Sequence, residues 1–327
     1  YSAYVKYNDV KYLKGAEMAL QALQGQKENR NYELFMPFGA YIGARLNAEQ
    51  GTDYDVMKFL NWTFEGKSVN RDGWGVIVGN WGNYDVSGIY GSTKDKGGYG
   101  FAMNTFDLAW PLLPMVRYDQ RYSRTIGKWA LNAANAARLF YPYDIPDSLQ
   151  ALPDRKGITK NVIAYEGLVK EPNLPGHIGK SPFAQGDGPL WAPGMPQETM
   201  FSIYGSGHAG IFGGTIHTTD VEGVLMLDCI ATDMFQKNAS YPTYIVYNPY
   251  KEKKSVSVPV GSSKVDIYDA VSQKIINRNV SGDVKIDIAA DEAPLLVFIP
   301  AGAKVIAKEG KLYAGDKIID FRFKEKK

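Results

Sequence analysis

The residues best suited to chemistry gather in residues 70–85, where tryptophan and tyrosine alternate with glycine, asparagine and aspartate. All six tryptophans of the 327-residue chain fall between Trp62 and Trp191. Flat apolar rings beside amide and carboxylate groups suit a sugar, because its C–H faces stack on aromatic planes while its hydroxyls need hydrogen-bond donors and acceptors. The same composition is poor for burying a core, so we expect these rings to face a carbohydrate. The expected stacking residues are Trp74, Trp81, Tyr84 and Trp191.

Three aspartates beside these rings are candidate catalytic residues. Asp72 and Asp85 bracket the aromatic stretch, and Asp187 lies between glycines near Trp191. A pair of carboxyl groups cleaves a glycosidic bond when one protonates the leaving oxygen while the other activates water or attacks the anomeric carbon. Each aspartate also has a competing interpretation as a turn residue, because Asp beside Gly readily forms an Asx turn. Further acids, in less informative surroundings, are Glu166 and Glu198.

A second candidate region, residues 204–214, surrounds His208 with glycine. Glycine lets a backbone approach a ligand closely, although small residues also permit tight helix packing. The region lacks the Gly-x-Ser-x-Gly spacing of a serine hydrolase and the Lys-Ser/Thr of a phosphate loop. The three histidines of the chain match no zinc-binding spacing, so we expect neither a metal nor another cofactor. Asp107 lies in an apolar stretch, where burial would raise the pKa of its carboxyl group or the side chain would cap a neighbouring helix.

Composition limits the class of protein. Hydrophobic residues make up 45% and charged residues 22%, as in an ordinary globular protein. The net charge is +2, from 37 Lys and Arg against 35 Asp and Glu, so we expect no nucleic-acid partner. No apolar run approaches the ~18–20 residues of a membrane span, and the single cysteine, Cys229, excludes an internal disulfide. The chain begins with Tyr1 rather than Met and carries no signal peptide, so we expect a processed or truncated chain.

Helices dominate the expected structure before residue 240. Apolar and small residues recur at helical spacing in residues 12–23 and 35–50, and Gly51 is expected to end the second of these helices. The clearest helix is expected in residues 121–140. Further helices are expected from a cap at Asp53 or Asp55 to Trp62, in 101–115 with interruptions at Pro111 and Pro114, in 205–214 and in 219–235.

The periodicity changes to that of β-strands near Tyr241. Short alternating runs separated by turn residues lie in residues 243–247, 255–260, 264–268, 284–288 and 295–299. They predict an antiparallel β-sandwich over residues 239–327, after a helical domain over residues 1–238. Within the helical domain, the proline-rich residues 141–200 are expected to form short strands and a lid that faces the substrate.

Three C-terminal segments and the order of the two domains resemble a known family. The segments are residues 242–250 (PTYIVYNPY), 265–270 (VDIYDA) and 293–300 (APLLVFIP). A helical domain followed by such a β module is similar to the bacterial (α/α)-toroid, or six-hairpin, glycoside hydrolases and to the related toroid polysaccharide lyases. The resemblance implies an α+β protein, with an (α/α)-toroid or a helical-hairpin arc followed by an antiparallel β-sandwich. A complete toroid has more helices than we expect before Tyr241. Either its N-terminal half is missing from this chain, which the start at Tyr1 rather than Met favours, or the helices form an arc.

The resemblance implies action on a polysaccharide or an oligosaccharide, with cleavage by a carboxyl acid and base as the first hypothesis. In the toroid lyases, Tyr or His abstracts a proton beside a uronate carboxylate, which implies that role for Tyr204 and His208. The third hypothesis is a glycan-binding protein that keeps the aromatic rings and does not cleave. The resemblance further implies a bacterial protein that is secreted or periplasmic, although this chain carries no signal peptide.

Overall fold

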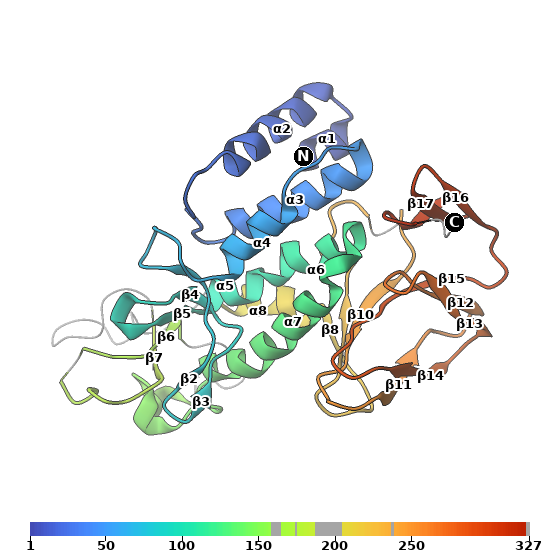
Figure 1. Ribbon diagram of the computed structural model, residues 1–327. Helices are drawn as coiled ribbons and strands as arrows, with labels where there is room; N and C mark the ends of the chain where they lie inside the picture. Colours follow the sequence, from blue (N-terminus) through green and yellow to red (C-terminus); the bar gives the residue numbers. More distant parts are fainter. Residues whose placement is uncertain (158–164, 174, 187–204, 237–238, 325–327) are drawn as a thin grey trace.

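The computed structural model describes residues 1–157, 165–173, 175–186, 205–236 and 239–324 (Figure 1). The fold is mixed α+β, as expected, with most helices before residue 140 and antiparallel sheets after residue 216. Figure 1 shows the helices between a small sheet at one end of the molecule and larger sheets at the other. No helix within the described ranges is both long and apolar enough to cross a lipid bilayer.

The chain begins with the helices α1 (Ser2–Tyr7), α2 (Val10–Gln24), α3 (Phe35–Gln50) and α4 (Val56–Phe64). Asp9 caps α2 and Asp55 caps α4, because each carboxylate accepts a hydrogen bond from a backbone amide of the first turn, at 3.0 and 2.9 Å. α3 ends at Gly51, whose φ of +71° is a left-handed conformation that glycine adopts readily. The expected range of residues 35–50 and the expected cap at Asp55 are therefore confirmed.

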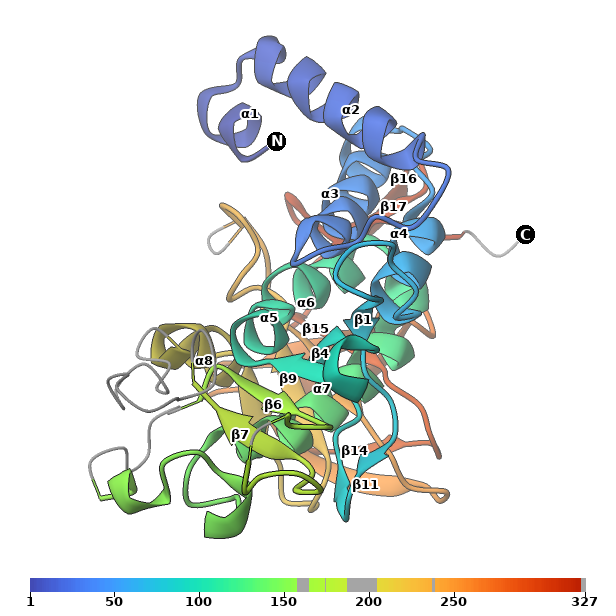
Figure 2. The same ribbon diagram turned by 90° about the vertical axis from the view of Figure 1, so that its left-hand side faces the viewer.

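Small residues on α3 let its neighbours approach closely. A Cβ atom on Gly39 would lie 2.5 Å from the Leu23 side chain of α2, and one on Gly43 would lie 3.4 Å from the Phe59 ring of α4. Figure 2 shows α2 lying beside α3, in line with these contacts. The face of α3 that carries these residues is buried along most of the helix.

Helices α5 (Ala102–Asp107), α6 (Ala109–Tyr118), α7 (Ser123–Ala137) and α8 (Gly205–Gly213) form the middle of the molecule. The interruptions expected at Pro111 and Pro114 are wrong, because the chain breaks at Leu108 and both prolines lie within α6. Pro111 is in the first turn of α6, where a backbone amide has no partner to lose. Pro114 removes one hydrogen bond, but α6 is buried along nearly its whole length, so packing outweighs that loss.

The small sheet contains, among the described residues, β1 (Trp74–Val76), β4 (Tyr90–Ser92), β5 (Tyr99–Phe101), β6 (Gly167–Val169) and β7 (Phe183–Gln185). Its strands lie in the order β1-β4-β5-β6-β7, and every neighbouring pair is antiparallel. The hairpin of β2 (Asn80–Trp81) and β3 (Tyr84–Asp85) lies between β1 and β4 in the chain. The expectation that this stretch is poor for burying a core is wrong, because Trp74 and Trp81 are only 4% and 5% exposed.

The C-terminal strands form further antiparallel sheets. The largest has the order β13 (Lys274–Val280), β12 (Val265–Asp269), β15 (Leu295–Pro300), β10 (Thr243–Tyr247), β9 (Leu225–Asp228) and β8 (Ile216–Thr218). The ribbon of β11 (Lys254–Pro259) and β14 (Asp283–Ile288) packs on this sheet through an apolar core that includes Val256, Ile286 and Phe298. A meander of β16 (Val305–Lys308), β17 (Lys311–Ala314) and β18 (Lys317–Asp320) follows. The expected β runs are therefore confirmed as strands.

The strands β8 and β9 correct the helix expected over residues 219–235. β9 pairs with β10 in antiparallel register, so that Leu227 lies opposite Ile245. Residues 224–230 form a short apolar run, and such a run fits a buried strand as well as a buried helix. Pairing with β10 decides between them. The larger sheet thus takes two strands from before residue 239, and the division of the chain at that residue stays a prediction.

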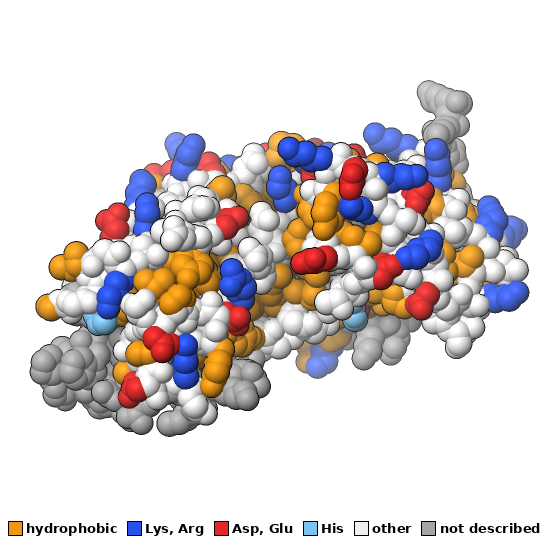
Figure 3. All heavy atoms as spheres, turned by 90° about the horizontal axis from the view of Figure 1, so that it is seen from below, with side chains coloured by type: hydrophobic (Ala, Val, Ile, Leu, Met, Phe, Trp, Pro, Cys, Tyr) orange, Lys and Arg blue, Asp and Glu red, His pale blue; other side chains and the backbone are white. Residues whose placement is uncertain are grey.

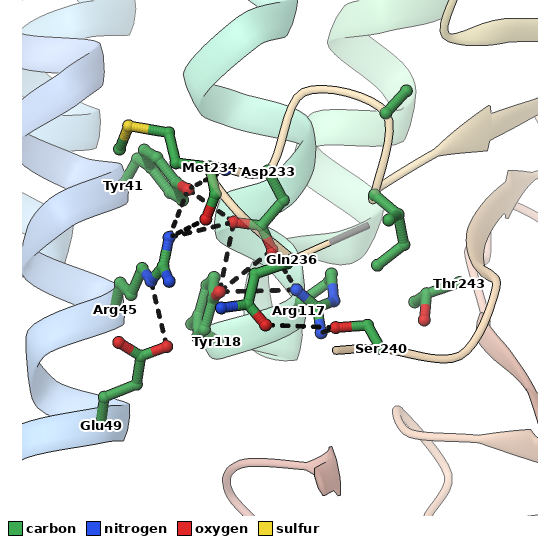
Figure 4. A network of polar contacts seen from close by, with 12 residues as sticks. Tyr41, Arg45, Glu49, Arg117, Tyr118, Asp233, Met234, Gln236, Ser240 and Thr243 are labelled. Atoms are coloured by element: carbon green, nitrogen blue, oxygen red, sulfur yellow. Dashed lines mark hydrogen bonds and ion pairs between the residues drawn. The ribbon is translucent and has the colours of Figure 1, made fainter. Parts of the chain in front are cut away.

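A buried network of charged side chains ties the helices to the segment between β9 and β10 of the larger sheet (Figure 4). Asp233 accepts hydrogen bonds from the hydroxyls of Tyr41, at 2.5 Å, and Tyr118, at 3.0 Å. The same carboxylate pairs with Arg45 of α3 and Arg117 of α6, whose side chains are almost fully buried. Because each of these charges has a partner of opposite sign, the network can be buried without leaving an isolated ion.

Candidate functional site

One face of the small sheet carries a cavity of about 470 Å³. A volume of this size suits a small-molecule ligand. Within the described residues, the lining combines aromatic, amide and charged side chains. They are Tyr32, Glu33, Arg71, Asp72, Trp74, Ser92, Asp95, Lys96, Tyr99, Phe101, Glu166 and Gln185.

The strand register places aromatic rings on one face of the sheet. Ser92 of β4 lies opposite Trp74 of β1 on one side and opposite Tyr99 of β5 on the other. Phe101 follows Tyr99 by two residues, and side chains two apart on a strand point to the same face. The Tyr99 and Phe101 rings are 6.2 Å apart and nearly parallel, while Phe101 and Tyr32 lie 6.1 and 5.0 Å from the Trp74 ring. These rings form a continuous apolar floor to the cavity.

The neighbouring set of paired residues in the sheet adds an amide side chain to this floor. Phe101 lies opposite Gly167 of β6, which lies opposite Gln185 of β7. A side chain at residue 167 would collide with the Tyr99 ring, because a Cβ atom there would lie 2.6 Å from it. Glycine at this position therefore lets the Tyr99 ring lie over β6.

Two polar atoms in the cavity wall have no hydrogen-bond partner among the described residues. They are Nε1 of Trp74 and Oε1 of Gln185, and both atoms are buried. A buried donor or acceptor without a partner costs free energy, and such groups are rare in folded proteins. The two atoms therefore mark places where a ligand or a bound water can supply the missing hydrogen bond.

Carboxyl groups lie at both ends of the strands that form the floor. Asp72 comes just before β1, and Asp95 comes shortly after β4, which runs antiparallel to β1. These two residues therefore lie at the same end of the sheet. Glu166 comes just before β6, which runs in the same direction as β4, so it lies at the opposite end. A ligand lying across the floor would have a carboxyl group on either side.

Two cations line the same cavity, and each lies over an aromatic ring. The guanidinium of Arg71 is 5.5 Å from the centre of the Tyr32 ring, and the ammonium of Lys96 is 6.0 Å from that of Tyr99. The described lining carries a formal charge of −2, because it contains two cations and four carboxyl groups. The carboxyl groups belong to Glu33, Asp72, Asp95 and Glu166. The cavity is therefore not a basic cleft.

Backbone strain is concentrated around the cavity. Ten described residues other than glycine have a positive φ angle, and four of the ten line the cavity. The left-handed conformation costs a residue with a side chain about 1–2 kcal/mol, so it persists only where the surrounding structure holds it. Ser92 supplies part of that hold by donating a hydrogen bond from its hydroxyl to the carbonyl of Asp72 at 2.9 Å. The four residues and their φ angles are Glu33 (50°), Arg71 (47°), Asp72 (52°) and Lys96 (50°).

Of the candidate residues, Asp72, Trp74 and Glu166 line the cavity. Tyr84 and Asp85 lie in the β2–β3 hairpin and are not part of the described lining. The carboxylate of Asp85 accepts a hydrogen bond from the backbone amide of Ser87 at 2.9 Å, so this aspartate makes the Asx turn of the competing interpretation. Its catalytic role stays a prediction.

Trp81 is buried against the backbone of the chain that enters β5. A Cβ atom on Gly98 would lie 2.4 Å from a carbon of the Trp81 ring, so only glycine leaves room for it. Glycine is therefore what allows this polar, Gly-rich stretch to bury a tryptophan. The remaining candidates, Asp187, Trp191, Glu198 and Tyr204, lie outside the described residues.

His208 forms a separate candidate site with Asp107. Nδ1 of His208 lies 2.8 Å from Oδ1 of Asp107, which joins α8 to α5. Burial raises the pKa of Asp107, and the contact with His208 opposes that shift. When the carboxylate accepts the Nδ1 hydrogen, the acceptor nitrogen of the neutral ring is Nε2, as a general base requires. Neither residue is in the described lining of the cavity.

Most residues of the floor were not predicted from the sequence. The pattern of Tyr99, glycine and Phe101 was the available signal, because alternation on a strand puts both rings on one face. Gln185 gave no signal, since its position depends on the pairing of β6 with β7. Glu166 was a weak candidate because nothing near it in the chain shows that it precedes a strand of this sheet.

Comparisons with protein-family models, with curated proteins and with solved structures found no match for this chain. The resemblance to toroid enzymes therefore stays a prediction. What the protein binds has to be inferred from the shape and chemistry of the cavity.

Proposed function

We propose that the protein is a glycoside hydrolase that binds a polysaccharide or an oligosaccharide in the cavity on the small sheet. One observation carries the proposal: a floor of aromatic rings lies between carboxyl groups at both ends of the strands. The rings match the C–H faces of sugars, and the carboxyl and amide groups match sugar hydroxyls.

Asp72 and Glu166 are the proposed catalytic pair. They line the cavity from opposite ends of the sheet, so a sugar chain on the floor has one carboxyl group on each side. One of them protonates the leaving oxygen, and the other activates water or attacks the anomeric carbon. Asp95 lies at the same end as Asp72 and is the alternative partner of Glu166.

The Asp107–His208 contact supports a second candidate function, a polysaccharide lyase. An imidazole held by a carboxylate is suited to removing the proton beside a uronate carboxylate, with Tyr204 as the proposed partner. A uronate polymer would favour a basic cleft, whereas the cavity that we propose holds the polysaccharide has an acidic described lining, and the Asp107–His208 pair lies outside it. On the face drawn in Figure 3, basic and acidic side chains are interspersed and form no large basic patch. We therefore place hydrolysis first.

We also propose the finer architecture and the location that the family resemblance implies. The helices before residue 140 would be an arc of an (α/α)-toroid, which the close packing of α2 and α4 against α3 supports. The ribbon of β11 and β14 on the larger sheet would be a β-sandwich, supported by their shared apolar core. Secretion or export to a bacterial periplasm would bring such an enzyme to extracellular glycans.

The test is incubation of the protein with a panel of plant, host and microbial glycans, followed by mass spectrometry and ultraviolet absorbance of the products. Saturated oligosaccharides are the expected result. Unsaturated products, which absorb because of their new double bond, would move the chemistry to His208 and Tyr204. Binding without any product would leave glycan binding as the function and reject both catalytic proposals.

A further inference from the structure

We infer that the ligand of the cavity is an uncharged oligosaccharide that spans the small sheet from β1 to β7. The indole N–H of Trp74 donates a hydrogen bond to a hydroxyl at one end, and the amide oxygen of Gln185 accepts one at the other. The inference rests on the proposed function, because it takes the ligand to be a sugar.

The two unpartnered atoms are complementary to hydroxyl groups. Trp74 offers a donor and Gln185 an acceptor, and a sugar hydroxyl can act as either. Both side chains are more than nine-tenths buried, at 4% and 2% exposed, and both belong to the described lining of the cavity. Because neither atom has a partner among the described residues, a ligand that meets both gains two hydrogen bonds that water supplies poorly at buried positions.

The positions of these two residues in the sheet set the size of the ligand. Trp74 lies in β1 and Gln185 in β7, which are the outer strands of the small sheet. Four spacings of about 4.8 Å separate these strands, so the sheet is up to about 19 Å wide between them. A chain of sugar rings lying on the floor is long enough to extend from one outer strand to the other.

The charge of the cavity sets the class of sugar. The described lining carries four carboxyl groups and two cations, and the cations lie over the rings of Tyr32 and Tyr99. Like charges repel more strongly where solvent is partly excluded, so uronate or sulfate groups would be rejected. Neutral sugars meet no such repulsion and can use every carboxylate as a hydrogen-bond acceptor.

The test measures binding by calorimetry with neutral cello-, xylo-, manno- and malto-oligosaccharides, each from the monosaccharide upward, and with oligogalacturonates. The expected result is that affinity for one neutral series rises with chain length and that oligogalacturonates bind more weakly. Equal affinity for mono- and oligosaccharides would reject the spanning ligand. Tighter binding of oligogalacturonates, or no binding to any probe, would also overturn the inference.

Two variants test the two ends separately. Trp74→Phe removes the N–H and keeps an aromatic ring, and Gln185→Met removes the amide at similar size. Each is expected to weaken binding of the longest neutral oligosaccharide by about tenfold or more, while short oligosaccharides lose less. Gln185→Met is also expected to raise the melting temperature of the free protein, because a buried acceptor without a partner is removed.

Thr232→Val is the matched control. Its hydroxyl oxygen is also buried without a partner among the described residues, but Thr232 lies outside this cavity. The variant is expected to leave sugar binding unchanged. Unchanged binding in Trp74→Phe and Gln185→Met, with the wild type still cleaving glycans, would reject this inference and leave the proposed function standing. If substitution of Asp72 and of Glu166 leaves the cleavage of glycans unchanged, the proposed function is rejected instead.

Discussion

Asp72 and Asp85 bracket the same aromatic stretch, but within the described structure Asp72 lines the cavity whereas Asp85 makes an Asx turn. We predict that Asp72→Asn lowers kcat by about 10²–10⁴-fold, since an amide can neither donate nor accept the proton that catalysis requires. Asp85→Asn should keep near wild-type turnover, because asparagine also accepts the hydrogen bond from Ser87. Steady-state kinetics on the glycan that the panel identifies would check both. The reverse pattern would place the chemistry at the hairpin.

The buried carboxyl group of Asp320 is expected to make the stability of the protein depend on pH. Its carboxylate is buried and accepts hydrogen bonds from Tyr268 at 2.9 Å and Gln273 at 3.1 Å. Burial raises the pKa of Asp320, and these hydrogen bonds oppose the shift. The folded protein therefore holds this proton more tightly than the unfolded chain, so the group's contribution to stability is fully present below the ordinary Asp pKa of about 3.9. That contribution is lost as the pH rises through the raised pKa.

The measurement for Asp320 is urea unfolding of the wild type and Asp320→Asn across acidic pH. The free energy of unfolding of the wild type, relative to the variant, is expected to fall with rising pH in that window. Other carboxyl groups titrate there as well, which is why the difference between the two proteins is the quantity to follow. A difference that is flat or that rises with pH would contradict the prediction.

At the scale of the elements, the strained loops around the cavity lead to one prediction that concerns both stability and binding. Lys96 has a φ of 50°, and Glu309, in the turn between β16 and β17, has a φ of 52°. Lys96→Gly and Glu309→Gly should each raise the free energy of unfolding by about 1 kcal/mol, because glycine adopts this conformation without strain. Only Lys96→Gly should weaken oligosaccharide binding, since Glu309 is not in the cavity lining. Denaturant unfolding and calorimetry on both variants would check this, and equal effects on binding would contradict it.

The elements with a strong local signal were predictable from the sequence. The range of α3, the cap at Asp55 and the alternating strands after residue 240 follow from spacing and turn residues alone. Of the small sheet, the short strands expected within residues 141–200 are confirmed by β6 and β7. The strands β1, β4 and β5 were missed because they are three residues long and rich in glycine, so no periodicity develops. The strands of this sheet are also joined by pairings between distant segments, such as Tyr99 with Val169, and these leave no local pattern.

The same limit explains the candidate site. Asp72 and Trp74 were predicted because an aspartate and a tryptophan close together in a glycine-rich stretch can be recognised from the local sequence alone. Gln185 became recognisable only when β7 was placed beside β6, and the position of Glu166 in the site became clear only when β6 was placed beside β5. The burial of Trp81 was missed for a related reason, since it depends on the absence of a side chain at Gly98.

At the scale of the whole molecule, Asp233 links α3 and α6 to the segment that joins β9 to β10 of the larger sheet (Figure 4). We predict that Asp233→Asn lowers the free energy of unfolding by about 3–5 kcal/mol, because Arg117 and Arg45 lose the buried carboxylate between them. Asp291→Asn is the control, since Asp291 pairs with Arg124 at the surface and should change stability far less. Chemical denaturation of both variants is the measurement. Equal losses would show that burial of the pair does not matter.

The small sheet has a consequence for the order of folding. Helices form from residues close in the chain, whereas the cavity needs residues 32–33, 71–101 and 166–185 to meet. Contacts between distant segments form slowly, because the chain between them must be ordered first. During refolding, the far-ultraviolet circular dichroism of the helices should therefore recover before the ability to bind sugar. A sugar ligand would report that the last step is complete and, by mass action, would hold the chain in that finished state.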